Sequence, residues 1–155
     1  MLYMTYDELL EEASSYGLIV KEKPLQGNKG RIFDKKIAIK KDVPTLKEKA
    51  CILAEELGHY HTTVGNIIDL QNVRNKKQEL RARLWAYNNQ IGLTGIIRAY
   101  EYGCHNLYSM ADYLDVTEEF LQDAIKYYQG KYGEYTAVDK YIIYFEPYLG
   151  VMKLI

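Results

Sequence analysis

The segment from Pro44 to Leu57 constrains the fold more than any other part of the sequence. Thr45 and Glu48 have the spacing of a capping box, so a helix is predicted to begin just after Pro44. The apolar residues of this helix lie on two sides, with Leu46, Ala50, Leu53, Ala54 and Leu57 on one and Cys51 and Ile52 on the other. A helix that is apolar nearly all round is buried, so the rest of the chain has to pack around it.

Three ionisable residues follow the apolar run 50–54 of this helix. Glu55, Glu56 and His59 lie within LAEELGHYHTTVGN, and Glu55 stands one helical turn before His59. Metallopeptidases with the H-E-x-x-H motif place two metal ligands at i and i+4, and the intervening Glu activates a water on the metal. Here the frame is present with a glutamate in place of the first histidine. The pattern predicts zinc ligands at Glu55 and His59 and a general base at Glu56.

A glutamate at the first ligand position alters the electrostatics of such a site without abolishing it. A carboxylate oxygen is an ordinary zinc ligand. With Glu55, a neutral His59 and a second carboxylate, the ligands would cancel the charge of Zn²⁺, which weakens it as a Lewis acid. We therefore expect slow turnover, which suits a regulatory peptidase better than a digestive one.

The third ligand is expected from the next long helix, predicted at about 75–91. Glu79 is our choice, because Ala82 and Ala86 follow it along the same face and are small enough to let two helices approach closely. Asp69 is the weaker substitute. A solvated ion pair between Glu79 and Arg83, four residues on, is the structural alternative.

Two neighbours of His59 need separate interpretations. His61 stands two positions after His59, which directs it away on a helix, so it is expected at the rim of the site or against substrate unless the helix ends by His59. Gly58 inside a helix costs about 1 kcal/mol relative to Ala. Close approach of a substrate or a neighbouring strand would explain that glycine.

The remaining sequence predicts an α+β fold that is mostly helical, as one domain over residues 1–155. The second long helix carries the apolar stripe Leu80, Leu84, Tyr87 and Ile91. The other expected elements are a helix from Thr5 to about Gly17, strands at 18–20 and within 30–40, helices at 94–102, 109–114 and 117–128, and a strand at 140–148. A strand within 30–40 is expected to bind substrate as an added strand, and normal cleavage by a folded Ile37→Pro or Ala38→Pro variant would contradict this.

Charge and composition disfavour several classes of partner. Residues 107–128 have the cadence of a helix-turn-helix, but no Lys or Arg lies between Arg98 and Lys126, so we interpret them as a packing module without direct nucleic-acid contact. The net charge is -1, no apolar run is long enough to cross a membrane, and the N-terminus has no signal-peptide pattern. Two cysteines form no disulfide framework, and a cytosolic protein is expected.

Several segments together resemble one known family. LAEELGHYHTTVGN, preceded by GRIFDKKIAI, followed by ELRARLWA and extended to the closing YIIYFEPYLGV, resembles the ImmA/IrrE family of metallopeptidase-like proteins, in particular its short phage and prophage members from Gram-positive bacteria. The resemblance implies a zincin-like core, zinc ligands at Glu55, His59 and Glu79, and a general base at Glu56. Family members encoded beside the repressor of a phage or mobile element are associated with cleaving it.

The resemblance therefore implies a zinc-dependent endopeptidase in the cytoplasm of a bacterial host, with a helix-turn-helix repressor as its substrate. Glu55 departs from the histidine that the family usually has at this position. An alternative function follows from that departure. A catalytically weak or inactive protein would bind and sequester the repressor as an antirepressor.

Overall fold

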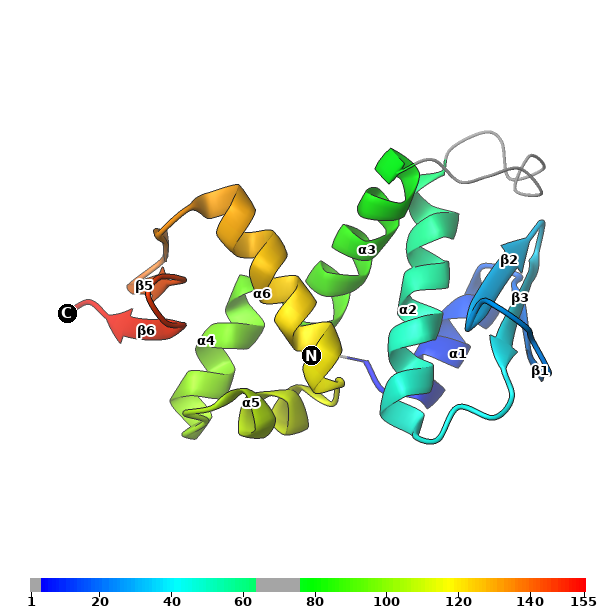
Figure 1. The fold of residues 1–155 in the computed structure, drawn as a ribbon, viewed down its shortest axis with the longest axis horizontal. Helices are drawn as coiled ribbons and strands as arrows, with labels where there is room; N and C mark the ends of the chain where they lie inside the picture. The colour runs from blue at the N-terminus through cyan, green and yellow to red at the C-terminus, as the bar shows by residue number, and fades with distance from the viewer. Residues whose placement is uncertain (1–3, 64–75) are drawn as a thin grey trace.

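The computed structural model describes residues 4–63 and 76–155 and confirms an α+β architecture (Figure 1). The elements in chain order are α1 (Tyr6–Ser15), β1 (Ile19–Lys23), β2 (Gly30–Phe33), β3 (Lys36–Lys40), α2 (Leu46–Thr62), α3 (Lys76–Gln90), α4 (Gly92–Tyr102), α5 (Leu107–Leu114), α6 (Glu118–Tyr132), β4 (Tyr135–Val138), β5 (Tyr141–Tyr144) and β6 (Gly150–Lys153). Across the two described ranges, no helix combines the length and apolarity needed to cross a membrane.

Helix α2 is buried along most of its length, as its apolar sequence predicts. Figure 1 shows it between α1 and the first sheet on one side and α3 on the other. Thr45 caps it by accepting a hydrogen bond from the backbone N–H of Glu48. The expected capping box is only half formed, because the Glu48 carboxylate accepts a hydrogen bond from Lys29 at 3.4 Å. Leu46, expected in the buried stripe, is 66% exposed because it lies in the first turn, beyond the surrounding elements.

The first sheet has the strand order β1-β3-β2, with β1 parallel and β2 antiparallel to the central strand β3. Strands β2 and β3 form the expected hairpin, and Asp34 takes a φ of 54° at its turn. Ile32, Ile37 and Ile39 are buried on the face that packs against α1 and α2. The predicted strand at 18–20 extends to Lys23, since it pairs along its length with β3.

Helix α3 forms where it is expected, but it buries a different face. Leu80 is 51% exposed, whereas Ala82 and Ala86 are fully buried against α2. The predicted stripe through Leu80 is therefore wrong at its start. Contact at short range with α2 selects the alanine face of α3, because larger side chains would hold the two helices apart.

The C-terminal part consists of α4, α5 and α6 followed by a second sheet, in which β4, β5 and β6 pair antiparallel in that order (Figure 1). The sequence predicts a single strand here. Only β5 and the residues after it have a strongly apolar pattern, and β4 and β6 are short and largely exposed. Helices α5 and α6 follow one another through a turn at Asp115, whose φ is 58°. They pack against each other, and α5 also packs against α4 and α6 against α3.

Candidate metallopeptidase site

Helix α2 presents the three predicted residues on adjacent faces. A helix advances about 100° per residue, so His59 projects between Glu55 and Glu56. Glu56 is 4% exposed and His59 is 3% exposed, whereas the side chain of Glu55 retains 38% of its exposure. The helix thus holds two polar side chains inside the protein, with a third at the edge of the buried region.

The structure brings His59 and Glu79 together. The Nε2 atom of His59 lies 3.5 Å from Oε1 of Glu79 on α3. Two ligand atoms bound tetrahedrally to one zinc ion at about 2.05 Å lie about 3.4 Å apart. An imidazole nitrogen and a carboxylate oxygen at this separation therefore fit a shared zinc ion without movement of either helix.

This convergence depends on a close contact between α2 and α3. A Cβ atom added to Gly58 would lie 2.2 Å from the carbonyl oxygen of Ala82, so only glycine fits there. The neighbour that requires Gly58 is thus a helix, and neither a substrate nor a strand is needed to explain it. Ala82 lies three residues after Glu79, so the contact sets the distance from Glu79 to His59.

Glu55 has a different neighbour. Its Oε1 atom lies 3.7 Å from Nε of Arg83 on α3. Arg83 therefore pairs with Glu55, whereas the sequence alternative was an ion pair between Arg83 and Glu79. Within residues 4–63 and 76–155, no three His, Cys, Asp or Glu side chains converge closely enough to hold a metal ion. The carboxylate of Glu55 would have to turn toward His59 to complete such a site.

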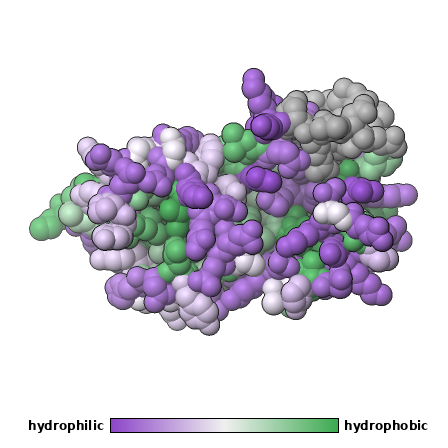
Figure 2. Space-filling view, in the orientation of Figure 1, coloured by the Kyte–Doolittle hydropathy of each residue, from purple (hydrophilic) through white to green (hydrophobic). Residues whose placement is uncertain are grey.

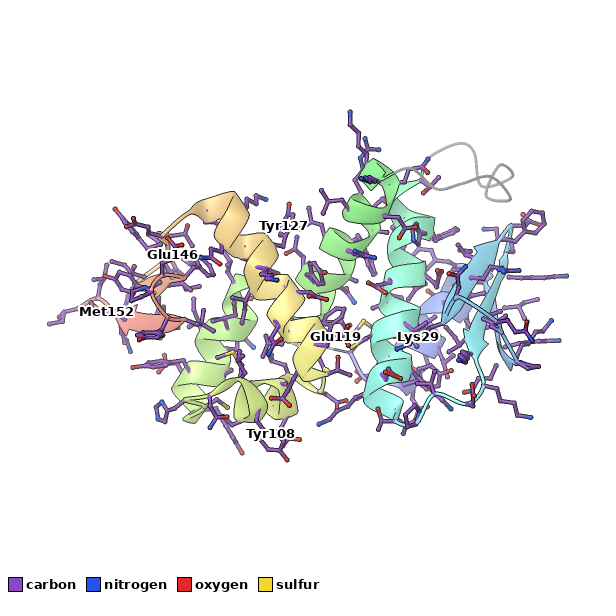
Figure 3. The ribbon with its side chains drawn as sticks, viewed as in Figure 1. Lys29, Tyr108, Glu119, Tyr127, Glu146 and Met152 are labelled. Carbon is purple, nitrogen blue, oxygen red and sulfur yellow. The ribbon has the colours of Figure 1, made fainter. Side chains whose placement is uncertain are left out.

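The surroundings of Glu55 are acidic. Burial is the main cause of a raised pKa at Glu55, and the guanidinium of Arg83 opposes it in part. Three further carboxylates raise this pKa, those of Glu79, Asp123 and Glu119. Glu119 lies at the start of α6, between that helix and α2 (Figure 3). A cation placed among these carboxylates would relieve their mutual repulsion.

Glu56 lies beneath the first residue of the edge strand β2. A Cβ atom on Gly30 would lie 3.0 Å from Cγ of Glu56 and 2.7 Å from Cγ2 of Ile52. The strand backbone therefore passes directly over the predicted general base. Sequence reasoning missed this role of Gly30, although a glycine at a strand end can indicate close approach of another group.

His61 lies away from His59, because α2 continues to Thr62. Its ring stacks on Trp85 with centroids 4.8 Å apart and meets the edge of Tyr16 at 4.7 Å. Burial lowers its pKa. His61 is thus part of an aromatic cluster, and Asp69, the substitute ligand, falls outside the described residues.

Sequence reasoning also missed the pairing of Arg83 with Glu55. The sequence feature that could have predicted this pair is the glutamate at position 55. A carboxylate in place of an uncharged histidine on a half-buried helix is stabilised by a cation on the facing helix. Arg83 stands four residues after Glu79 on that helix.

Comparison with known proteins identifies the family of the chain. Residues 4–126 match peptidase family M78, described as the IrrE N-terminal-like domain. The match ends within α6, so the second sheet lies beyond it. No curated protein matches the sequence significantly. Because the matched stretch contains α2, α3 and the first sheet, the chain belongs to the IrrE N-terminal-like family of metallopeptidase-like proteins.

Proposed function

We propose that the protein is a zinc-dependent endopeptidase of a phage or other mobile element, which cleaves a helix-turn-helix repressor in the cytoplasm of its bacterial host. One observation carries the proposal. Glu56 is buried on α2 beneath strand β2, and His59, three residues later on the same helix, faces Glu79 of α3. The proposed general base, two candidate ligands and a strand edge therefore lie around one turn of α2.

The donor set fits zinc, because imidazole nitrogen and carboxylate oxygen are both ordinary ligands of this ion. His59, Glu79 and Glu55 would hold it, with Glu55 turned from Arg83. When bound, zinc would supply a positive charge that polarises the scissile carbonyl. Glu56 would take the proton of the attacking water and later deliver it to the leaving amine. Its burial excludes bulk water from that transfer.

Strand β2 has the position required to hold an extended substrate. The backbone N–H of Lys40 donates to the carbonyl of Lys29 at 2.8 Å, so these residues form a hydrogen-bonded pair. In an antiparallel ladder such pairs alternate with pairs whose polar groups point outward. Gly30 and Ile32 therefore direct their N–H and C=O groups to the outer edge of β2, where a peptide strand can pair.

The strand order changes the test proposed from the sequence. Ile37 and Ala38 belong to the central strand β3 and not to the edge beside the site. A proline at either position would remove hydrogen bonds inside the sheet and disrupt the fold itself. The outward-facing backbone groups that a substrate strand would meet belong instead to Gly30 and Ile32 of β2.

Cleavage of the repressor encoded beside the gene tests the proposal. The wild-type protein is expected to cut this repressor, and the Glu56→Gln variant is expected to bind it while turnover falls at least a hundred-fold, since the base is lost. Gel electrophoresis reports cleavage, and co-purification reports binding. Unchanged cleavage by Glu56→Gln would rule out the assigned base.

The ion pair between Glu55 and Arg83 favours a second candidate function. If Glu55 stays with Arg83, two of the three predicted ligands, His59 and Glu79, face each other, and the protein would act as an antirepressor that sequesters the repressor. Such a clamp would relieve repression equally well with Glu56→Gln. A reporter gene under the repressor's operator separates the two functions, because an enzyme would lose most of its effect.

A further inference from the structure

The outer face of the first sheet carries an ordered set of cations. Side chains alternate between the two faces of a strand. Ile37 and Ile39 of β3 are buried against the helices, so Lys36, Ala38 and Lys40 point to the opposite face. Figure 3 shows nitrogen-tipped side chains projecting from this sheet away from the helices, and the same edge is hydrophilic in Figure 2.

Strand register places four of these cations around one small residue. Ala38 pairs with Lys21 on β1 and with Arg31 on β2, so the three lie in one row across the sheet. Along β3, Lys36 and Lys40 flank Ala38 on the same face. Neighbouring strands are about 4.8 Å apart, and alternate residues of one strand are about 6.7 Å apart. We name Lys21, Arg31, Lys36 and Lys40 the cationic face.

The cationic face is not neutralised by the rest of the described chain. In residues 4–63 and 76–155, Lys21, Arg31 and Lys36 form no salt bridge, and Lys40 reaches only Asp42 at 4.0 Å. Like charges this close repel one another, which a bound anion would relieve. Ala38 is small enough to leave room above the sheet at the centre of the four charges.

We propose that the cationic face binds an acidic segment of a protein partner, with a carboxylate seated over Ala38. The face borders the open edge of β2, since Arg31 directly follows Gly30, the residue over Glu56. A peptide strand paired with that edge presents every second side chain toward the cationic face. The inference rests on the proposed function only in identifying this partner as the substrate. In that case the protein would prefer substrates that have acidic residues near the cleaved bond.

Strand pairing favours a protein segment over nucleic acid. The cationic face borders the open edge of β2, where the N–H and C=O groups of Gly30 and Ile32 point outward and can pair with a peptide backbone. A nucleic acid has no backbone N–H groups with which to form such a ladder. An acidic peptide segment can therefore occupy the edge and the cationic face together.

Fluorescence anisotropy with the full chain tests this inference. The probes are a labelled peptide of alternating Glu and Gly, its Gln and Gly counterpart, and a labelled DNA duplex. The charge-reversed variant is Lys21→Glu with Arg31→Glu. The control is Lys126→Glu with Lys140→Glu, which changes the net charge equally at two exposed lysines of the C-terminal half.

We expect the acidic peptide to bind the wild-type protein, the Gln peptide not to bind, and the charge-reversed variant to lose affinity on the order of ten-fold while the control changes less than about two-fold. Circular dichroism checks that both variants fold. No binding by the acidic peptide, or equal losses in both variants, would overturn the inference. Tighter binding of the duplex, lost in the same variant, would assign the face to nucleic acid instead.

These measurements are independent of catalysis. Peptide binding is read without cleavage, so a protein that proved not to be a peptidase would leave the result standing. Conversely, a cationic face that binds nothing would leave repressor cleavage and its dependence on Glu56 unaffected.

Discussion

Glu55 stands where a histidine would complete the H-E-x-x-H motif, and its neighbours are suited to a carboxylate. Arg83 offsets its charge, and the carboxylates of Glu79, Asp123 and Glu119 make the region attractive to a cation. A neutral imidazole at this position would remove the counterion that Glu55 provides to Arg83. The glutamate at position 55 therefore changes the charge of the site, and the charged residues around it match that change.

Gly30 permits a prediction about Glu56, the proposed general base, which lies beneath it. In a Gly30→Ala variant the new methyl group would displace Glu56 or Ile52, which lie within 3.0 Å of the added Cβ. We expect repressor cleavage to fall on the order of ten-fold or more, because a general base acts only within a narrow range of positions. The free energy of unfolding should fall by only about 1 kcal/mol.

Gly150→Ala is the matched control, since an added Cβ there meets no atom within 4 Å. Both variants are assayed for cleavage and for chemical denaturation. Full cleavage by Gly30→Ala would show that β2 does not position Glu56.

Glu22 supports a prediction about pH. It accepts hydrogen bonds from Lys49 at 2.9 Å and from Tyr6 at 3.0 Å, and the bond from Lys49 is the main cause of its lowered pKa. A carboxyl whose pKa is lower in the folded state stabilises the fold above its ordinary pKa of 4.5, and this contribution disappears as the pH falls through the folded value.

The Glu22→Gln variant should therefore be less stable than the wild type by about 0.5–1 kcal/mol at neutral pH, because this pair is partly exposed. The difference should shrink as the pH falls below about 4. Urea denaturation at a series of pH values measures it. A difference that stays constant down to acidic pH would exclude the assigned network.

At the scale of elements, the contact between α2 and α3 decides whether the site exists. Glu79 reaches His59 only because Gly58 admits the backbone of Ala82. Neither helix contains the complete site. Strand β2 then covers the other side of α2 at Glu56.

A Gly58→Ala variant is expected to force α2 and α3 apart, because the added methyl group would lie 2.2 Å from a backbone oxygen that cannot rotate away. The cost should be about 2–4 kcal/mol in the free energy of unfolding. Thermal and urea denaturation measure the loss. Separation of the helices should also weaken binding of any metal ion.

Gly130→Ala in α6 serves as the comparison, since an added Cβ there contacts nothing within 4 Å. Alanine is the better helix former, so this variant should gain about 0.5–1 kcal/mol. Equal behaviour of the two variants would contradict the close packing at Gly58.

At the scale of the whole molecule, the candidate site lies between the first sheet and α3, with α2 common to both (Figure 1). The part of the chain that matches the family contains all of these elements, and the second sheet lies beyond it. Positive charge gathers on the outer face of the first sheet, and the start of α6 is acidic. The net charge of -1 conceals this separation.

Local patterns in the sequence predict the elements better than they predict contacts. The capping residues and apolar periodicity locate α1, α2 and α6 because these signals act within a few residues. The buried face of α3 was wrong at Leu80, since it depends on a glycine in another helix. The central position of β3 and the pairing of Glu55 with Arg83 likewise depend on tertiary neighbours. Strands β4 and β6 are too short and too exposed to produce a clear alternation.

The metal content of the purified protein shows whether Glu55, His59 and Glu79 form a zinc site. Elemental analysis of the wild-type protein is compared with Glu55→Ala and Glu79→Ala, and with Glu134→Ala as a control that removes an exposed carboxylate just before β4. We expect about one zinc ion per chain in the wild type and in the control, and a loss of most of the zinc in both site variants. A wild-type protein without zinc, or site variants that retain it, would rule out this metal site.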